Sequence, residues 1–139
     1  MEILDILILG SGPAALCLAS ELAKQNLNIK GISTKSPYEK WENTYGIWAS
    51  ELEEFGLASL LSHRWSKTVS YFGDGIKDKG NSPTKHYYDY GLINQEAFQN
   101  ELLKTCKGIQ WLNETAKLIK SENKISEVIC SSGLKLKAR

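Results

Sequence analysis

Two glycines near the N-terminus have the spacing that lets a phosphate group rest against bare backbone. They lie in the run Gly10-Ser11-Gly12-Pro13-Ala14-Ala15, after an apolar stretch and before a helix-forming one. Gly10 permits a tight turn, and Gly12 lacks the Cβ atom that would keep a diphosphate away. The N–H groups and the positive dipole end of the following helix attract the same anion. This run and Leu9 are therefore predicted to bind the diphosphate of a dinucleotide.

The segments on either side of the turn match a β-α-β unit of about thirty residues, which is the context that the motif requires. The apolar run Ile3 to Leu9, interrupted by Asp5, predicts a parallel strand buried on both faces. A second strand is predicted from Leu27 to Ile32, after a helix from Pro13 to about Gln25. The helix is expected to bury one stripe of residues, Ala15, Leu18, Ala19, Leu22 and Ala23. The alternative is a β-α-β corner in which the glycines serve only the turn.

The acidic residue that usually binds a ribose about 20 residues after the glycines is absent. Ser33 and Thr34 stand at the end of the second predicted strand, followed by Lys35. Their hydroxyl groups can hydrogen-bond a ribose, but more weakly than a carboxylate can. We therefore assign Ser33 and Thr34 to the predicted site and leave open whether FAD or NAD(P) binds at the glycine turn.

Composition excludes several classes of partner. The net charge of +1 comes from 17 basic and 16 acidic residues, which predicts no nucleic-acid binding. The three cysteines are far apart and the two histidines lack partners at ligand spacing, so we expect a reducing compartment and no metal site. No targeting segment is recognisable and no apolar run approaches the ~20 residues of a membrane helix. A cytoplasmic protein is expected, with peripheral membrane contact left open.

The rest of the chain alternates loops with short regular elements. Residues 34–50 lack periodicity, Ser50 is expected to cap a helix over 51–62, and a strand over 65–72 is expected to pair with 86–93. A polar loop is expected over 73–83. Asn94 is expected to cap a helix ending near Cys106, with an inner stripe of Phe98, Leu102 and Cys106.

Four short strands are expected in the tail, over 109–112, 116–121, 125–130 and 134–138. The predicted fold class is α/β, a Rossmann-like FAD/NAD(P)-binding β-α-β unit with an added antiparallel β-meander. Because no further parallel strand remains to cover the first two, residues 1–139 are expected to be the N-terminal part of an FAD/NAD(P)-binding domain within a longer enzyme.

Three stretches together resemble a known family. They are the run from Asp5 to Ala15, then Trp41-Glu-Asn-Thr-Tyr-Gly-Ile-Trp48, then Tyr88-Asp-Tyr-Gly-Leu-Ile-Asn94. The first is shared by many flavoproteins, whereas Asn-x-Tyr-Gly-Ile-Trp is far more specific, and His63-Arg-Trp-Ser66 also looks like the family. The chain resembles about the first third of the flavin-dependent lycopene cyclases of the beta/epsilon type found in photosynthetic organisms.

The resemblance implies closure of the acyclic ends of lycopene into ionone rings, with no net redox change. It implies FAD, whose ADP moiety would lie at Gly10, Ser11, Gly12, Ala14 and Ala15, and NADPH as the reductant of the flavin. It also implies a carotenoid partner and a peripheral place on photosynthetic membranes. The chemistry needs a carboxylic acid whose pKa is raised by an apolar pocket. The catalytic glutamates of the family belong to a later motif, so the catalytic residues stay unassigned, and Glu39 and Glu42 are interpreted as solvated loop carboxylates.

Aromatic residues concentrate in the middle of the chain, where 11 of the 13 fall between Tyr38 and Tyr90. Trp41, Tyr45 and Trp48 are candidates for lining the flavin or the polyene, or else they pack the domain. Gln95 stands where related flavoproteins often carry an arginine over the cofactor, or else it merely begins a capped helix.

Two other functions remain open at this stage. An FAD-dependent oxidoreductase of the monooxygenase or polyprenyl reductase type could share this N-terminal part, because a fold does not fix a function. An inactive nucleotide-binding fragment is the other. The sequence does not distinguish a beta from an epsilon ring, or closure of one end from closure of both.

Overall fold

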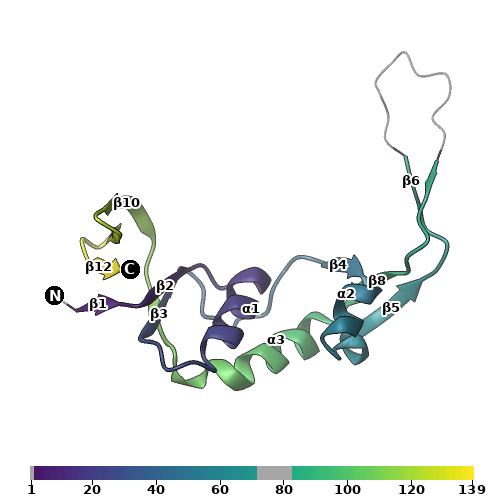
Figure 1. Ribbon diagram of the computed structural model, residues 1–139, viewed down its shortest axis with the longest axis horizontal. Helices are drawn as coiled ribbons and strands as arrows, with labels where there is room; N and C mark the ends of the chain where they lie inside the picture. The colour runs from purple at the N-terminus through teal and green to yellow at the C-terminus, as the bar shows by residue number, and fades with distance from the viewer. Residues whose placement is uncertain (1, 72–82) are drawn as a thin grey trace, which may run out of the picture. The chain divides into compact units, whose positions relative to one another are not determined.

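The computed structural model describes residues 2–71 and 83–139, which divide into two compact units (Figure 1). The first unit comprises Met1–Trp41 and Gln99–Arg139, and the second comprises Glu42–Phe98. Nearly all of the polar loop expected over 73–83 lies outside the described residues. Each unit is described below by itself.

A parallel sheet forms one half of the first unit. Its strands are β2 (Ile6–Leu9), β3 (Ile29–Ser33) and β9 (Gln110–Asn113), in the order β2-β3-β9. The helix α1 (Pro13–Leu22) connects β2 to β3, which confirms the predicted β-α-β unit. The expectation that no further parallel strand follows is wrong, because β9 pairs with β3. A short apolar segment does not reveal which strand it pairs with, so the sequence alone places residues 109–112 with the strands of the tail.

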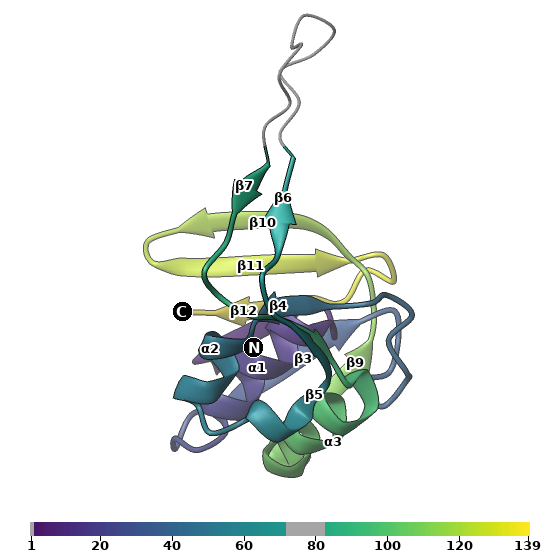
Figure 2. The ribbon, with the colours of Figure 1, turned by 90° about the vertical axis from the view of Figure 1, so that its right-hand side faces the viewer.

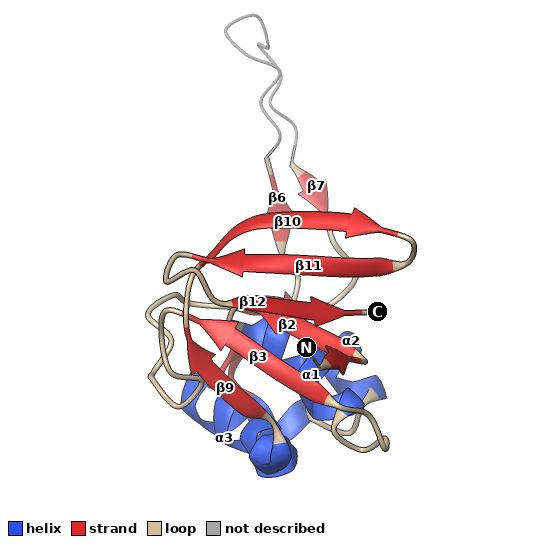
Figure 3. Cartoon of the chain, turned by 90° about the vertical axis from the view of Figure 1, so that its left-hand side faces the viewer, coloured by secondary structure: helices blue, strands red, loops and turns tan. Residues whose placement is uncertain are grey.

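A second sheet of the first unit has the strand order β1-β12-β11-β10. In it β10, β11 and β12 form an antiparallel meander (Figure 3), and β1 pairs with β12 in parallel. Its strands are β1 (Ile3–Leu4), β10 (Ala116–Glu122), β11 (Ile125–Cys130) and β12 (Lys135–Ala138), so the tail strands were predicted to within one residue. Asn123 and Lys124 turn between β10 and β11 with φ of 50° and 65°. Apolar side chains of both sheets meet around buried Ile32, Val128 and Cys130.

The first predicted strand is in fact two strands in different sheets, broken at Asp5. The Asp5 carboxylate accepts hydrogen bonds from the Asn28 N–H at 2.9 Å and from Arg139 Nη1 at 3.0 Å. A carboxylate needs such polar partners, so it marks the point where the chain leaves the meander and enters the parallel sheet. The prediction that the run from Ile3 to Leu9 is buried on both faces is also wrong at its two ends, since Ile3 and Leu9 are exposed.

The helix α1 begins at Pro13 as predicted but ends at Leu22, and β3 begins at Ile29 rather than Leu27. Its buried residues are Leu16, Ala19 and Ser20, whereas Leu18 is 51% exposed. The buried face of α1 is therefore rotated about the helix axis relative to the predicted stripe. The buried face includes a polar contact, since the Ser20 hydroxyl lies 2.7 Å from the Thr105 hydroxyl, and an apolar stripe alone does not predict such a position.

The second unit contains a three-stranded antiparallel sheet in the order β4-β8-β5. The strands are β4 (Gly46–Trp48), β5 (Leu61–Trp65) and β8 (Tyr90–Ile93). The interpretation of 34–50 as lacking regular structure is therefore wrong over 46–50, where β4 and the start of a helix lie. The helix predicted over 51–62 is replaced by α2 (Ala49–Glu54) and the 3-10 turn η1 (Ala58–Leu60). Gly56 adopts φ of 70° and ends α2, and Ser50 lies inside this helix rather than capping it.

A two-stranded ribbon extends from this sheet (Figure 2). It consists of β6 (Val69–Ser70) and β7 (Thr84–Lys85). The predicted strand 65–72 is therefore divided between the sheet and the ribbon, whereas the predicted strand 86–93 is shortened to β8 and still pairs with β5 as expected. The long helix α3 (Gln95–Thr105) follows β8 and continues into η2 (Cys106–Gly108). Its predicted cap is confirmed, because Asn94 Oδ1 accepts the Ala97 N–H at 3.1 Å. Its predicted stripe, Phe98, Leu102 and Cys106, is buried.

Candidate nucleotide-binding site

The glycine turn between β2 and α1 is open to a ligand. Gly10 has φ of 97°, a conformation that favours glycine, and its N–H donates to the Ile32 carbonyl at 2.8 Å. A Cβ atom built on Gly10 or Gly12 would meet no atom within 4 Å. The carboxyl end of β2 therefore carries bare backbone beneath open space, which is the arrangement that a diphosphate requires.

The N-terminus of α1 supplies donors at this turn. Gly12 is its N-cap residue and Pro13 its first helical residue, and no side chain among the described residues caps it. The first intrahelical bond runs from the Leu16 N–H to the Gly12 carbonyl at 3.0 Å. The N–H groups of Ala14 and Ala15 precede it and so have no intrahelical acceptor. Together with the helix dipole, they form a site for an anion.

A pair of serines stands where the ribose-binding acid is usually found. Ser11 Oγ lies 2.9 Å from Ser33 Oγ, and Ser11 Oγ also donates to the Lys35 carbonyl at 3.2 Å. Ser33 is half-buried, whereas Thr34 is exposed. The two hydroxyl groups therefore tie the glycine turn to the end of β3, which brings together two separately predicted parts of the site.

Trp41 belongs to the packing of the turn. Its indole is 8% exposed, and its Nε1–H donates to the Ser11 carbonyl at 3.0 Å. This hydrogen bond fixes the orientation of the Ser11 carbonyl within the glycine turn. Its predicted role in lining the flavin or the polyene stays a prediction.

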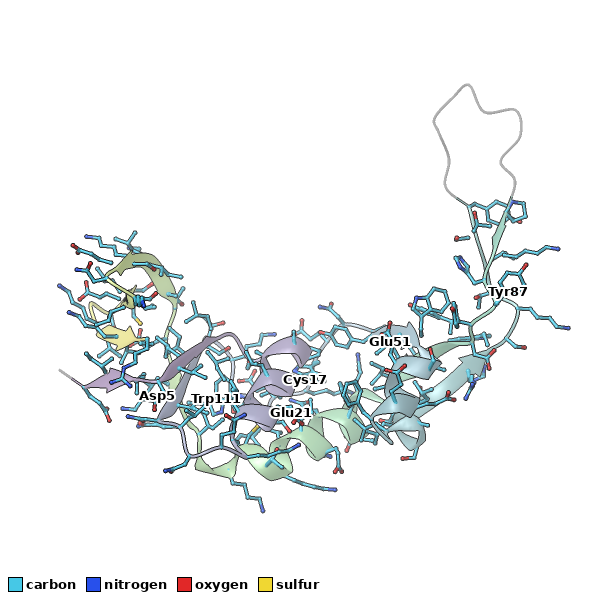
Figure 4. The ribbon with its side chains drawn as sticks, in the orientation of Figure 1. Asp5, Cys17, Glu21, Glu51, Tyr87 and Trp111 are labelled. Carbon is cyan, nitrogen blue, oxygen red and sulfur yellow. The ribbon has the colours of Figure 1, made fainter. Side chains whose placement is uncertain are left out.

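A cavity of about 330 Å³ opens at the carboxyl ends of β3 and β9, beside Ser33. This is the edge of a parallel sheet at which α/β folds bind ligands. Trp111, labelled in Figure 4, lines the cavity, and its buried indole N–H has no hydrogen-bond partner among the described residues. The same ring covers Gly31, where a Cβ atom would lie 2.2 Å from it.

The loop on one side of the cavity is held by Gln99, which the sequence analysis missed. This side chain is 5% exposed, and its Nε2 donates to the carbonyls of Pro37 and Glu39, both at 2.7 Å. Glu39 in turn accepts the Ser36 N–H at 3.0 Å and lines the cavity. The only signal in the sequence was a polar residue next to the apolar stripe of α3.

The remaining candidates, Tyr45, Trp48 and Gln95, belong to the second unit. The Trp48 ring lies 5.1 Å from His86 and 5.4 Å from Tyr90, between ring centroids. The carbonyl of Tyr45 accepts the Ile93 N–H at 2.9 Å, and Gln95 is the half-buried first residue of α3. The two aromatic signature stretches thus pack on each other across β4 and β8.

Gly46 shows why this part of the signature carries glycine. A Cβ atom at Gly46 would lie 2.1 Å from the Tyr90 hydroxyl oxygen and 2.4 Å from the adjoining ring carbon. A side chain at this position would displace the Tyr90 ring, so the Tyr-Gly-Ile-Trp run has a structural explanation within the second unit.

The titratable groups offer little acid–base or nucleophilic chemistry in the described part of the chain. The buried polar side chains there are Ser20 and Gln99, and no carboxylate is buried. Burial raises the pKa of the Cys17, Cys106 and Cys130 thiols, so all three are protonated at neutral pH. Among residues 2–71 and 83–139, no three His, Cys, Asp or Glu residues are grouped to hold a metal ion.

The fold is that of the Rossmann-type flavoproteins. A probable FAD-dependent monooxygenase from Pseudomonas aeruginosa matches with a TM-score of 0.60 at 16% identity, over 99% of this chain and 41% of that one. The p-nitrophenol 4-monooxygenase of Pseudomonas putida matches with a TM-score of 0.61 at 19% identity, over 99% and 40%. The model of the lycopene cyclase protein family matches residues 5–139, and the chain belongs to that family.

Curated relatives agree with this assignment. A lycopene beta cyclase of Synechococcus elongatus is 42% identical over 137 residues, which are 97% of this chain and 32% of the relative. The chloroplastic lycopene beta cyclase of Arabidopsis thaliana is 30% identical, over 99% of this chain and 26% of the relative. This chain thus spans about a third or less of these relatives. No helix among its described residues is long and apolar enough to cross a membrane.

Proposed function

We propose that residues 1–139 are the N-terminal part of a longer flavoprotein that binds the ADP moiety of FAD at the glycine turn and closes the acyclic ends of lycopene into rings. The observation that carries this proposal is the open turn itself, in a chain of the lycopene cyclase family. Gly10 and Gly12 present bare backbone to open space, and the N–H groups of Ala14 and Ala15, at the start of α1, have no intrahelical acceptor.

The residues present fit the ADP half of the cofactor. The backbone from Ser11 to Ala15 would hold the diphosphate, and Ser33 would hydrogen-bond the ribose at the edge of the cavity. Because the Ser11 hydroxyl donates to the Lys35 carbonyl, the Ser33 hydroxyl donates to Ser11 Oγ, and Ser33 Oγ can accept a hydrogen bond from a ribose hydroxyl. Thr34 is exposed, so its hydroxyl group would contact the same ribose only at the solvent-facing edge of the site.

Ring closure is an isomerisation in which one proton is added to a terminal double bond and another is lost from the resulting cation. A reduced flavin, when bound, supplies an electron-rich ring beside which such a cation is stabilised. NADPH as the reductant is part of the proposal and is supported by the family resemblance. The acid that protonates the polyene must lie in an apolar setting, and no carboxylate of the described chain does, so we place the acid elsewhere in the full-length enzyme.

The test is a product analysis of the full-length protein. Purified with FAD and supplied with lycopene and NADPH, it should yield a cyclised product of unchanged molecular formula. Consumption of oxygen, or net reduction of the substrate, would instead establish an oxidoreductase on the same fold. Gly12→Val should abolish FAD retention, because its branched side chain would fill the space above the turn. Gly108→Val is the matched control, since a Cβ atom there also meets nothing within 4 Å.

A further inference from the structure

The cavity at the carboxyl ends of β3 and β9 contains a carboxylate close to the place of the missing ribose-binding acid. Glu39 lines this cavity together with Ser33, which precedes it by six residues. The usual acid stands at the end of the strand, so the position of Glu39 in the following loop does not reveal it in the sequence. The fold nevertheless brings a hydroxyl group and a carboxylate to one cavity.

Three hydrogen bonds hold Glu39 in this loop. Its N–H donates to the Ser36 carbonyl at 3.0 Å, and its carbonyl accepts Gln99 Nε2 at 2.7 Å. One carboxylate oxygen, Oε1, accepts the Ser36 N–H at 3.0 Å. The other oxygen, Oε2, accepts no hydrogen bond from any residue that the structure describes. Glu39 is therefore fixed by its backbone and by one oxygen, and the second oxygen can bind a ligand.

Ser33 alone cannot satisfy both hydroxyl groups of a ribose. The Ser33 hydroxyl donates to Ser11 Oγ, and its oxygen accepts the Lys35 N–H at 3.3 Å, which leaves one lone pair. The adjacent 2′ and 3′ hydroxyl groups of a ribose donate two hydrogen bonds. A carboxylate accepts up to about four hydrogen bonds, so Glu39 supplies the acceptor that Ser33 lacks.

An independent observation indicates that this cavity receives a ligand. Trp111 lines the cavity, and its buried indole N–H has no hydrogen-bond partner among the described residues. Buried donors are nearly always paired, so an unpaired one points to an acceptor that these residues do not supply. The adenine that is attached to the ribose carries ring nitrogens that accept hydrogen bonds.

We propose that Glu39 is the ribose-binding carboxylate of this chain and selects a dinucleotide whose adenosine ribose carries no 2′-phosphate. Its Oε2 accepts hydrogen bonds from the ribose hydroxyl groups, and its negative charge repels a phosphate at the 2′ position. Lys35 also lines the cavity, and its positive charge acts in the opposite direction. The inference rests on the proposed function and answers a question that the sequence leaves open, because FAD lacks the 2′-phosphate that NADP carries.

The alternative is that Glu39 only closes the turn at Ser36. Glu39→Gln separates the two roles, because the amide oxygen still accepts the Ser36 N–H while the negative charge is lost. The free energy of unfolding of this variant should therefore equal that of the unsubstituted protein in urea. A change in nucleotide binding then reports on the cavity rather than on the loop.

The first measurement uses the full-length protein freed of FAD and titrated with ADP or 2′-deoxy-ADP. The unsubstituted protein should bind ADP about tenfold more tightly, because a hydrogen bond to a charged acceptor is worth more than a neutral one. Glu39→Gln should lose most of this difference by binding ADP more weakly. Equal binding of the two nucleotides by the unsubstituted protein, or an unchanged difference in Glu39→Gln, would overturn the proposal.

The second measurement tests the repulsion of a phosphate, with ADP-ribose and its 2′-phosphate as a matched pair. The unsubstituted protein should bind ADP-ribose about tenfold more tightly. Glu39→Gln should abolish or reverse this preference, because Lys35 is then the remaining charge of the cavity lining. A preference for the 2′-phosphate in the unsubstituted protein would show that Lys35 sets the selectivity and that Glu39 does not.

A control removes an exposed carboxylate elsewhere. Glu51 of α2, labelled in Figure 4, is exposed and does not line the cavity, so Glu51→Gln should leave both comparisons unchanged. An equal effect of Glu51→Gln would mean that net charge, rather than the position of Glu39, governs binding.

Failure of this inference can be told apart from failure of the proposed function. If the protein retains FAD and cyclises lycopene while Glu39→Gln binds every nucleotide as the unsubstituted protein does, the role of Glu39 is refuted and the proposed function stands. If the predicted discrimination between nucleotides is found but no cyclised product forms under any condition, the proposed function fails and the role of Glu39 stands.

Discussion

The indole N–H of Trp41 donates a hydrogen bond to the carbonyl of Ser11 at 3.0 Å, across 30 residues of sequence. Ser11 lies between the two glycines of the turn, and Trp41 opens the aromatic signature of the family. The contact therefore joins the general nucleotide-binding motif to the family-specific one. Through it a buried tryptophan holds the backbone of the turn at which we propose that the cofactor binds.

This contact predicts the effect of Trp41→Phe. Phenylalanine keeps most of the apolar volume but has no N–H, which leaves the Ser11 carbonyl without this donor. We expect the binding free energy of FAD to weaken by about 1 kcal/mol, which raises the dissociation constant of FAD roughly fivefold in the full-length protein. Equilibrium titration with FAD measures it. The control is Trp65→Phe, at an exposed tryptophan of β5, and equal weakening by the two would refute a specific role for Trp41.

The hydrogen bonds of Gln99 predict an effect of substitution on folding stability. Its amide nitrogen donates to two loop carbonyls, and Gln99→Glu would replace that donor by a carboxylate of the same shape. The buried charge would face two carbonyl oxygens, so we expect the free energy of unfolding to fall by about 3 kcal/mol. Urea unfolding of the full-length protein at neutral pH measures this, with Gln95→Glu at the half-buried start of α3 as control. Equal losses in both variants would argue against the loop contacts.

Local patterns were enough to predict parts of this fold. The glycine turn, the Asn94 cap and the tail strands each depend on residues close together in sequence, and all were predicted correctly. The break at Asp5 depends on partners 23 and 134 residues away, which no local pattern contains. The same holds for β9, whose parallel partner β3 is remote in sequence, and for Gln99, whose acceptors lie 60 and 62 residues earlier.

The close approach of Trp111 to Gly31 predicts a steric effect inside the parallel sheet. In Gly31→Ala the new methyl group would lie 2.2 Å from a ring carbon, so the indole or the strand must shift. Overpacking of this kind costs about 1–3 kcal/mol. Thermal unfolding should show it, and Trp111→Leu in the same protein should relieve much of the cost. If Gly31→Ala proved neutral, or if the second substitution gave no relief, the ring could not be the cause.

The buried thiols predict a dependence of stability on alkaline pH. Burial raises the pKa of Cys106 above its ordinary value, so the folded state keeps this proton to higher pH than the unfolded state does. Its contribution to stability is complete below the ordinary thiol pKa of about 8.5 and is lost as the pH rises towards the folded value. The loss is at most about 1.4 kcal/mol for each unit of pH. Cys106→Ala should flatten the decline in unfolding free energy above that pH, measured by urea unfolding from pH 7 upwards. Cys17→Ala, at a less buried thiol, should flatten it less, and parallel curves for all three proteins would show that the decline has another origin.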